Sequence, residues 1–311
     1  MTTTAIAIDL GTAAVAVLVL AGGASAFVTG ATRIARRLGL SGLVIGLTVV
    51  AFGTSAPEFA VTLDAALAAK SDISVGNVVG SNVVNLGFVL GGAALVRAIP
   101  TSEDLLRRDS VVLVGTTLLA ILVLWDLRVS RAEGAVLFAL LLAYLAFLVR
   151  SGSDRIRAPE VSADGGAADV VRLVGGLAGV VIGAHLLVLA ASDLAREAGI
   201  AEWAIGVTVV ALGTSTPEFV TSVVAARRGR AGLSAGNLVG SCIFNVLGVL
   251  GLAAVVRPLP VASAALPSVA WLLAVVLVAT ALLWSRRVLS RAEGAVLVGL
   301  NALNWLVDLL P

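Results

Sequence analysis

The stretch that decides the fold is GLTVVAFGTSAPEF at residues 46–59, which recurs as GVTVVALGTSTPEF at residues 206–219. The two stretches lie 160 residues apart and are identical at 11 of 14 positions. At the same offset, residues 74–97 match residues 234–257 at 14 of 24 positions. Because no gap is needed to align them, the two halves of the chain are a duplication.

The composition places this duplication in a membrane. The chain has 311 residues, of which 59% are hydrophobic and 13% are charged. A soluble domain is typically about 45–50% apolar and about 25% charged. Apolar runs of about 20 residues recur along the whole chain without alternating, which indicates transmembrane helices and not a β-barrel. We therefore predict an all-α integral membrane protein.

The apolar runs predict ten transmembrane helices in two groups of five. Their approximate ranges are 8–32, 41–69, 73–97, 109–127, 131–150, 170–195, 201–226, 233–257, 265–285 and 291–310. The polar segment 151–169 then links a first five-helix repeat at 1–150 to a second at 170–311. The first ten residues carry Asp9 and no Lys or Arg, so we expect the first span to be retained and not cleaved as a signal peptide.

The distribution of basic residues predicts that the second repeat is inverted. Five spans is an odd number, so the second half should cross the membrane in the opposite sense. With the N-terminus outside, the cytoplasmic side holds 16 of the 21 basic residues, as the positive-inside rule expects. Both termini are then outside and the 151–169 loop is cytoplasmic. Inverted repeats with a binding site at their interface are typical of secondary transporters, although a duplicated structural bundle remains an alternative.

Two acidic residues, Glu58 and Glu218, stand near the middle of predicted spans. A carboxylate at that depth costs about 2.5 kcal/mol or more on insertion scales, so it indicates a functional site. The alternative, a neutralised carboxylate kept for helix packing, is disfavoured because both acids occur in the same GTS-x-PE sequence. We predict that they belong to one site.

The neighbouring residues predict helix breaks that expose oxygen ligands. Pro57 and Pro217 each remove a backbone donor, and Gly53 and Gly213 loosen the helix further. Freed carbonyls inside a membrane need a partner, and a cation bound in a polar cavity would supply one. The candidate oxygens beside the two acids are the carbonyls of Ala51 and Ala211 and the hydroxyls of Thr54, Ser55, Thr214 and Ser215.

A second repeated motif, G-N-x-V-G-S-x-x-x-N, contributes further polar side chains. Ser81 and Asn85 are four residues apart and share one helical face, as do Ser241 and Asn245. We predict these four as ligands, so that helices 2, 3, 7 and 8 form the site. Asn77 and Asn237 are interpreted as helix support, and the motif glycines 76, 80, 236 and 240 should permit close helix approach.

The ligand types predict a hard cation. Every candidate ligand is an oxygen, which suits Ca²⁺, Mg²⁺ or Na⁺, whereas softer metals prefer His or Cys. The only histidine, His185, is expected to be a satisfied interior residue, and Cys242 is expected to serve packing. Asp64 is left open as a residue of an outer vestibule. Glu133 and Glu293 each follow a serine in the repeated SRAEGAVL segment and predict helix capping boxes.

The paired GTS-x-PE and GN-x-x-GS motifs resemble the α-repeats of the cation/calcium exchanger superfamily, specifically its prokaryotic sodium/calcium antiporters. The resemblance covers nearly the whole chain. It implies alternating access with spans 1 and 6 sliding as a pair, exchange of several Na⁺ for one Ca²⁺, and the ligand set named above. Some relatives, including potassium-dependent exchangers, carry Asp at the position of Asn245, so Asn here favours a site without an extra carboxylate.

Other functions were weighed against a sodium/calcium antiporter. A proton/calcium or other divalent cation antiporter would use the same buried acids, because protons can replace Na⁺ on a carboxylate. An intramembrane enzyme lacks an evident nucleophile and base, and a passive channel would not need a counter-ion. We expect no cofactor and no nucleic-acid partner, since the basic residues are scattered between apolar runs. The expected ligands are Ca²⁺, Na⁺ and the lipid bilayer.

Overall fold

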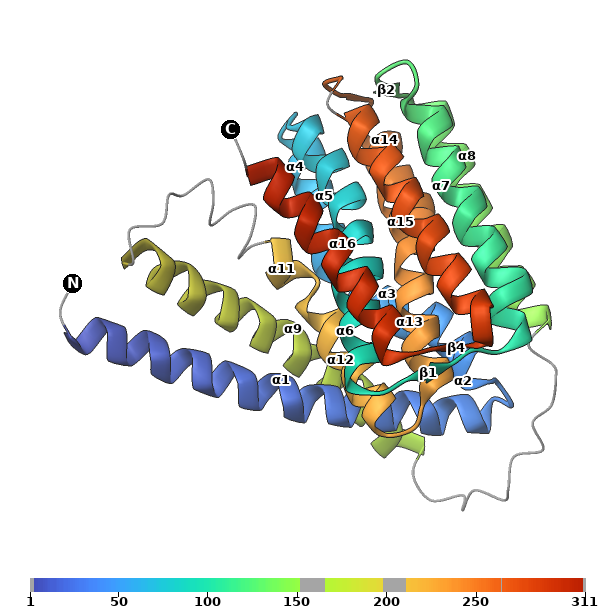
Figure 1. The fold of residues 1–311 in the computed structure, drawn as a ribbon. Helices are drawn as coiled ribbons and strands as arrows, with labels where there is room; N and C mark the ends of the chain where they lie inside the picture. Colours follow the sequence, from blue (N-terminus) through green and yellow to red (C-terminus); the bar gives the residue numbers. More distant parts are fainter. Residues whose placement is uncertain (1–2, 152–165, 198–210, 264, 310–311) are drawn as a thin grey trace.

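The computed structural model describes residues 3–151, 166–197, 211–263 and 265–309. Within these residues the fold is helical apart from four two-residue strands (Figure 1). Helices cover the described parts of all ten segments predicted as spans. Residues 201–210 of the seventh segment and 152–165 of the linker lie outside the described residues.

Several helices are interrupted, so one span consists of more than one element. The first half contains α1 (Thr3–Arg37), α2 (Gly42–Ile45), the π-helix η1 (Gly46–Val50), α3 (Ala51–Thr54), α4 (Ala56–Leu67), α5 (Ser71–Val84), the π-helix η2 (Asn85–Val89), α6 (Leu90–Val96), β1 (Ile99–Pro100), the π-helix η3 (Leu105–Asp109), α7 (Ser110–Leu124), β2 (Arg128–Val129) and α8 (Arg131–Ser151). The second half contains α9 (Gly166–Glu197), α11 (Ala211–Thr214), α12 (Thr216–Arg227), α13 (Ala231–Phe244), the π-helix η5 (Asn245–Leu250), α14 (Gly251–Val256), β3 (Leu259–Pro260), α15 (Ala265–Arg286), β4 (Val288–Leu289) and α16 (Arg291–Leu309).

Six helices in the described residues are long and apolar enough to cross a membrane. They are Ile6–Arg37, Ser71–Val96, Arg131–Arg150, Gly166–Ala191, Ala231–Val256 and Ala265–Arg286. The pair Gly42–Thr54 and Ala56–Leu67 passes the same test as one bent span. The chain is therefore an all-helical, multi-pass membrane protein.

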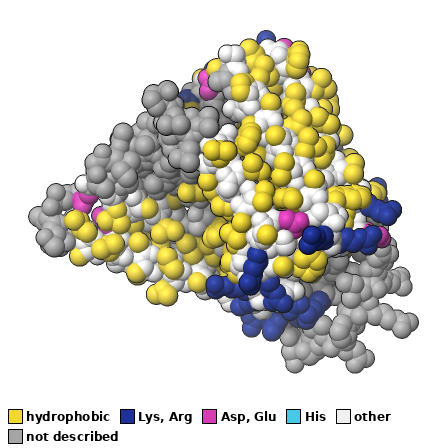
Figure 2. All heavy atoms as spheres, viewed as in Figure 1, with side chains coloured by type: hydrophobic (Ala, Val, Ile, Leu, Met, Phe, Trp, Pro, Cys, Tyr) yellow, Lys and Arg dark blue, Asp and Glu magenta, His cyan; other side chains and the backbone are white. Residues whose placement is uncertain are grey.

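The outer surface has the character that a bilayer requires. Leu18 on α1, Leu122 on α7 and Trp125 beyond it are 73%, 69% and 73% exposed. Figure 2 shows hydrophobic side chains spread over the flank of the helices, with Lys and Arg gathered at the lower end. Because lipid tails are as apolar as these side chains, their exposure carries no hydrophobic penalty in a bilayer.

Glycine lets the long helices α1 and α9 pack along each other (Figure 1). A Cβ atom added at Gly23 would lie 2.8 Å from the Val180 nitrogen, and one at Gly30 would lie 2.6 Å from the Leu173 nitrogen. No side chain fits at such distances, so the backbones meet directly. In a membrane, where apolar side chains gain nothing by leaving lipid, this close van der Waals contact is a main source of helix association.

Contacts between the two halves occur in equivalent pairs. The helix α6 packs on α16, and its repeat equivalent α14 packs on α8. Both crossings are made by glycines. A Cβ at Gly91 would lie 2.7 Å from the Gly294 carbonyl oxygen, and one at Gly134 would lie 2.6 Å from the Gly251 carbonyl oxygen. In the sequence repeat, Gly91 is equivalent to Gly251 and Gly134 to Gly294. The two helix crossings are therefore equivalent to each other.

The four short strands also pair between the two halves in equivalent ways. Strand β1 pairs antiparallel with β4, with Ile99 opposite Leu289, and β2 pairs antiparallel with β3, with Val129 opposite Leu259. The β1–β4 ladder lies at the lower end of the helices in Figure 1, and β2 lies at the upper end. Equivalent strands of the two repeats, β1 and β3, thus lie at opposite ends of the molecule.

Helix capping agrees with the sequence prediction. The Glu133 carboxylate accepts hydrogen bonds from the Ser130 nitrogen (2.8 Å) and hydroxyl (2.7 Å), and the Glu133 nitrogen donates back to the Ser130 hydroxyl at 3.3 Å. The same three bonds join Ser290 and Glu293. Both predicted capping boxes are confirmed, and these acids are used at helix ends.

Candidate cation site

The first GTS-x-PE segment forms a sharp break between α3 and α4. The break falls at Ser55, whose φ of −81° and ψ of 10° are not helical, and the axes on either side differ by 49°. Pro57 lies in the first turn of α4, where its missing N–H would have no helical partner and its fixed φ suits the helix start. The predicted break is therefore present, and it places Glu58 in the first turn of α4.

The second GTS-x-PE segment folds in the same way. Ser215 has a φ of −86° and a ψ of 4°, between α11 and α12, and Pro217 lies in the first turn of α12. Glu218 is therefore placed in its helix as Glu58 is. Each acid stands at the N-terminal end of a half-helix, where the helix dipole favours negative charge.

The two acids meet the opposite repeats' serines in the interior. The Ser55 hydroxyl donates to Oε1 of Glu218 at 2.9 Å, and the Ser215 hydroxyl donates to Oε1 of Glu58 at 3.3 Å. The Ser241 hydroxyl also donates to Glu218 Oε1, at 3.4 Å. Both acids are fully buried. Residues 160 positions apart therefore form one cluster, with each acid bonded across the boundary between the halves.

The charge of this cluster is not balanced by the protein around it. No Lys, Arg or His in the described part of the chain forms an ion pair with Glu58 or Glu218, and Oε2 of each acid has no hydrogen-bond partner there. Burying an unpaired carboxylate costs several kcal/mol. Among the described residues, no three His, Cys, Asp or Glu side chains are grouped so that they could hold a metal ion together. A cation bound by this pair would thus complete its coordination with neutral oxygens.

Asn77 and Asn237 brace the helices that carry the acids. The Asn77 amide nitrogen donates to the Glu58 carbonyl oxygen at 3.1 Å and to the Thr62 hydroxyl at 2.9 Å. The Asn237 amide nitrogen donates to the Ser222 hydroxyl at 2.9 Å. Thr62 and Ser222 are repeat equivalents, so each half uses the same link. These contacts agree with the interpretation of both asparagines as helix support.

The other predicted hydroxyl and carbonyl ligands differ in which hydrogen bonds they already make. The buried Thr54 hydroxyl lies 3.1 Å from the Val50 carbonyl and 3.0 Å from the Asn237 side-chain oxygen. The Ser81 hydroxyl donates to the Asn77 carbonyl at 2.5 Å, so only its oxygen lone pairs remain for a ligand. The Ala51 carbonyl accepts from the Ser55 nitrogen at 3.0 Å, and the Thr54 hydroxyl lies 3.5 Å from the same oxygen. Thr214 is half-buried, and Ala211 begins α11 at the edge of the described residues.

The predicted ligands Asn85 and Asn245 each begin a π-helix, η2 and η5. Both residues are fully buried. Neither amide atom of Asn85 has a partner among the described residues, and the Asn245 side-chain oxygen has none either. The helices of the acids pack against these segments, α4 on η5 and α12 on η2. π-Helical turns are frequent at functional sites, and here they mark both asparagines.

Asn82 is a polar residue near the site that the sequence did not single out. Its side-chain oxygen accepts a hydrogen bond from the Asn245 amide nitrogen at 3.0 Å, and its own amide nitrogen donates to the Cys242 carbonyl at 3.0 Å. The first bond fixes which end of the Asn245 amide remains unpaired, namely the oxygen. Asn85 has no such partner, because the repeat equivalent of Asn82 is Cys242. The sequence signal that could have indicated this contact is the difference between Asn82 and its repeat equivalent Cys242 in otherwise similar motifs.

The motif glycines of the second half make close helix contacts. A Cβ at Gly236 would lie 2.6 Å from the Leu43 carbonyl oxygen, and one at Gly240 would lie 2.7 Å from the Leu47 Cα. These glycines allow Gly42–Thr54, the first half of the broken span, to pack with its backbone directly against α13. Their equivalents Gly76 and Gly80 are exposed, and no described atom comes within 4 Å of a Cβ at either. The predicted close approach is confirmed at 236 and 240. At 76 and 80 it stays a prediction, because residues 203–210, the repeat equivalents of 43–50, lie outside the described residues.

Three further residues were predicted to have roles outside the ligand set. His185 is exposed on α9, so its interpretation as an interior histidine is wrong. Its neighbour Ala184 faces α1 and is 4% exposed, and one helical step of about 100° turns the next side chain away from that contact. Cys242 is fully buried, as expected for packing. Asp64 is exposed on α4, and its role in an outer vestibule stays a prediction.

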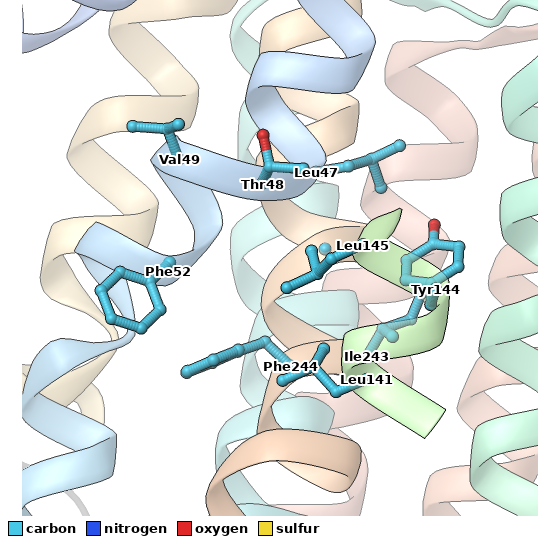
Figure 3. A pocket seen from close by; sticks show the side chains of 10 residues that line it. Leu47, Thr48, Val49, Phe52, Leu141, Tyr144, Leu145, Ile243 and Phe244 are labelled. Atoms are coloured by element: carbon cyan, nitrogen blue, oxygen red, sulfur yellow. The ribbon is translucent and has the colours of Figure 1, made fainter. Parts of the chain in front are cut away.

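An apolar pocket of about 270 Å³ lies beside the broken span but does not contain the acids (Figure 3). Its walls come from η1, α3, α8 and α13, and its aromatic side chains include Phe52 and Phe244, whose ring centroids are 5.2 Å apart. The Tyr144 hydroxyl donates to Asp109 at 3.0 Å. With no carboxylate in its lining, this pocket offers nothing to hold a small cation.

Fold and site together define a class of protein. Buried carboxylates and neutral oxygens, placed at helix breaks inside a bundle of apolar helices, are the features of membrane transporters that bind a cation at mid-membrane. The fold and the buried acid pair point to this class of membrane transporters.

Comparisons with known proteins identify the family. Residues 8–150 and 169–307 match the family model described as sodium/calcium exchanger protein. The chain is 35% identical over 299 residues to the putative antiporter CaxA of Alkalimonas amylolytica, covering 91% of this chain and 93% of that protein. It is 33% identical over 286 residues to the sodium/calcium exchanger MaX1 of Methanosarcina acetivorans, covering 78% and 82%. The chain belongs to the sodium/calcium exchanger family.

A solved structure supports the same relationship. The sodium–calcium exchanger NCX_Mj, soaked without Na⁺ and Ca²⁺, superimposes with a TM-score of 0.85 at 32% identity. The match covers 96% of this chain and 98% of that one. At this identity and coverage the likeness extends over nearly the whole chain.

Proposed function

We propose that the protein is an antiporter that exchanges Ca²⁺ for Na⁺ across the cytoplasmic membrane at the cluster around Glu58 and Glu218. The observation that carries the proposal is the buried acid pair itself. Each carboxylate is held by a serine of the opposite repeat, and neither has a basic partner among the described residues. Two negative charges in a low-dielectric interior are stable only with a bound cation or proton.

The proposed ligand set selects a hard cation. It consists of the Glu58 and Glu218 carboxylates with neutral oxygens from Thr54, Ser55, Ser81, Asn85, Thr214, Ser215, Ser241 and Asn245 and the carbonyls of Ala51 and Ala211. Ca²⁺ accepts six to eight oxygen ligands in flexible geometry. Two carboxylates neutralise one Ca²⁺ or two Na⁺, and neutral oxygens can hold a further Na⁺. Alternate loading of one site with either ion would enforce exchange.

The relatives support Ca²⁺ and Na⁺ as the ions. MaX1 is named a sodium/calcium exchanger, and NCX_Mj is a sodium–calcium exchanger studied with Na⁺, Ca²⁺ and Sr²⁺. The proposal assigns transport to this chain, with no covalent chemistry and no cofactor. Coupling to protons is the remaining competitor, since a carboxylate can carry H⁺ in place of Na⁺.

The proposed architecture is ten transmembrane helices in two inverted repeats, 1–150 and 170–311, joined by the 151–169 loop. The placement of β1 and β3 at opposite ends of the molecule supports the inversion. The gathering of Lys and Arg at the lower end in Figure 2 supports a cytoplasmic location for that end, with both termini outside. Helices 2, 3, 7 and 8 would then approach the site from the two sides of the membrane.

Alternating access is proposed to use the glycine contacts of the two halves in turn. The first half of the broken span is packed on α13 through Gly236 and Gly240, whereas Gly76 and Gly80 are exposed on α5. The residues packed on Gly236 and Gly240 lie between 43 and 51, and most of their repeat equivalents, 203–211, lie outside the described residues. Helices α1 and α9, packed along each other, would move as a pair.

Reconstituted vesicles distinguish Na⁺ from H⁺ coupling. Purified protein in liposomes loaded with Na⁺ should take up radiolabelled Ca²⁺ when diluted into Na⁺-free buffer, and vesicles loaded with K⁺ should not. A pH gradient imposed without Na⁺ should drive no uptake. Uptake driven by that pH gradient would overturn the sodium assignment, and uptake without any counter-ion inside would indicate a channel.

Replacing Asn82 by leucine should weaken apparent Ca²⁺ affinity by about tenfold, in line with the loss of a buried hydrogen bond worth about 1–2 kcal/mol. The reason is that the Asn245 amide loses the acceptor that orients it. Asn82→Asp keeps the acceptor oxygen and should restore most of the affinity. The measurement is the Ca²⁺ dependence of Na⁺-driven uptake. An equal effect of Asn82→Leu in an Asn245→Ala background would show that Asn82 does not act through Asn245.

A further inference from the structure

A second cavity, larger than the apolar pocket and partly lined by charged residues, lies at the basic end of the molecule. Its volume is about 670 Å³. Three segments far apart in sequence line it, namely residues 32–43 at the junction of α1 and α2, residues 100–102 after β1, and residues 229–233 at the start of α13. Two of the lining residues, Arg36 and Arg230, carry charge, and both are positive.

The arginines around this cavity have more positive charge than the described residues neutralise. Asp169 is buried and already pairs with Arg33, Arg37 and Arg172, at 3.3, 2.9 and 2.9 Å. Arg36 and Arg230 form no ion pair among the described residues. Figure 2 shows Lys and Arg side chains gathered at the lower end of the molecule. The cavity is therefore a positively charged hollow.

Crowding of like charge strains this arrangement. The pKa of the Arg230 guanidinium lies below its usual value because it is partly desolvated and because Arg36 and Arg228 repel its charge. Arg228 turns instead to neutral oxygens, donating to the Ser25 carbonyl at 3.0 Å and the Thr29 hydroxyl at 2.8 Å. An anion between Arg36 and Arg230 would relieve the repulsion, and arginine binds phosphate oxygens in a bidentate manner.

Beside the two arginines the lining combines four hydroxyl side chains, Thr32, Ser41, Thr101 and Ser102, with apolar walls, and such walls favour an amphiphile over a free ion. Leu40, Leu43, Pro100 and Leu233 form walls beside the two arginines. Leu38, in the same connection, is 64% exposed, as expected of a side chain that reaches the bilayer. Basic pockets between transmembrane segments at a membrane surface are typical binding sites for acidic headgroups. The phosphate would meet the arginines while the glycerol and the first acyl carbons meet the walls.

We propose that this cavity binds the phosphate headgroup of an anionic phospholipid from the adjoining leaflet, held between Arg36 and Arg230. The bound lipid would join the end of α1 to the start of α13. A Cβ at Gly232 would lie 3.3 Å from the Leu43 nitrogen, so the cavity adjoins the glycine contact that seats the broken span on α13. Occupation should therefore stabilise the fold in the conformation described above.

The repeat supplies a matched control. Lys70 is the equivalent of Arg230 and, like it, is the residue before a helix, with φ and ψ of −96° and 62° against −93° and 54°. Two residues on, however, the first half has Asp72 where the second has Gly232. Lys70 thus has the same backbone conformation and the same charge as Arg230, but an aspartate follows it two residues later. Lys70→Gln tests the loss of a positive charge at the equivalent place without touching the cavity.

The experiment measures thermal unfolding of purified full-length protein in neutral detergent, with short-chain phosphatidylglycerol, short-chain phosphatidylcholine or inorganic phosphate added. Phosphatidylglycerol should raise the melting temperature of the wild type and of Lys70→Gln. Arg36→Gln/Arg230→Gln should need at least about tenfold more of it, because two charge-assisted contacts are lost. Native mass spectrometry should show one retained lipid in the wild type.

Three results would overturn the proposal. An unchanged phosphatidylglycerol response of Arg36→Gln/Arg230→Gln would place the lipid elsewhere. An equal response to phosphatidylcholine would mean that the walls alone bind lipid. An equal response to inorganic phosphate, lost in the arginine variant, would make the cavity a site for a free anion. A variant that does not fold is replaced by the single changes Arg36→Gln and Arg230→Gln, for which a graded loss of the response is expected.

Discussion

Glu58→Gln and Glu218→Gln should each reduce Na⁺-driven Ca²⁺ uptake by at least about 100-fold, since removing one partner of a buried charged cluster costs about 3–5 kcal/mol. Glutamine has the shape of glutamate and can still accept from Ser215 or Ser55, the serines that bind the two acids. The loss would therefore reflect the missing charge. With one carboxylate, the site could no longer balance a divalent cation, and with none it would be neutral.

The control for this experiment is Glu133→Gln. Glu133 carries the same functional group but serves the capping box at the start of α8. Its replacement should lower stability slightly and leave uptake near the wild-type rate once folded protein is counted. Uptake is measured with radiolabelled Ca²⁺ in proteoliposomes, and folding by size-exclusion chromatography. Wild-type flux in both Glu58→Gln and Glu218→Gln would refute the assignment of the site.

Gly236→Ala should lower stability sharply, whereas its repeat equivalent Gly76→Ala should not. The added Cβ at 236 would lie 2.6 Å from the Leu43 carbonyl oxygen and 3.1 Å from the Leu47 nitrogen, so backbone must move. Overpacking of this kind typically costs about 1–3 kcal/mol. At Gly76 no described atom lies within 4 Å, and alanine favours a helix over glycine by up to about 1 kcal/mol.

The apparent melting temperature in detergent tests this pair of substitutions. We expect a fall of several degrees for Gly236→Ala and no change or a small rise for Gly76→Ala. Gly240→Ala and Gly80→Ala repeat the comparison one turn further along. A Cβ added at Gly240 would lie 2.7 Å from the Leu47 Cα. Equal destabilisation by Gly236→Ala and Gly76→Ala would mean that the two halves pack alike, contrary to the glycine contacts described above.

The local features of the candidate site were predictable because they depend on residue type and spacing. Pro57 and Pro217 indicated the helix breaks that occur at Ser55 and Ser215. The burial of Glu58 and Glu218 followed from their depth in apolar runs, and the repeat offset indicated that they form a pair. A proline cannot donate a backbone hydrogen bond wherever it lies, so such inferences need no knowledge of distant contacts.

Features that depend on contacts between the halves were not predictable. The hydrogen bond between Asn245 and Asn82 joins positions 163 residues apart, and no local pattern indicates it. The exposure of His185 depends on which face of α9 packs on α1. The π-helical turns at Asn85 and Asn245 were also missed, because the backbone there follows from packing and not from propensity.

The most direct test of the central claim is a Ca²⁺-binding titration of the purified protein at several Na⁺ concentrations. If one site serves both ions, the wild type should bind Ca²⁺ at a single site per chain, and rising Na⁺ should displace it with a steeper than hyperbolic dependence, because more than one Na⁺ replaces each Ca²⁺. Neither Glu58→Gln nor Glu218→Gln should retain this binding. Ca²⁺ binding that Na⁺ leaves unchanged, or that survives in both variants, would contradict the account.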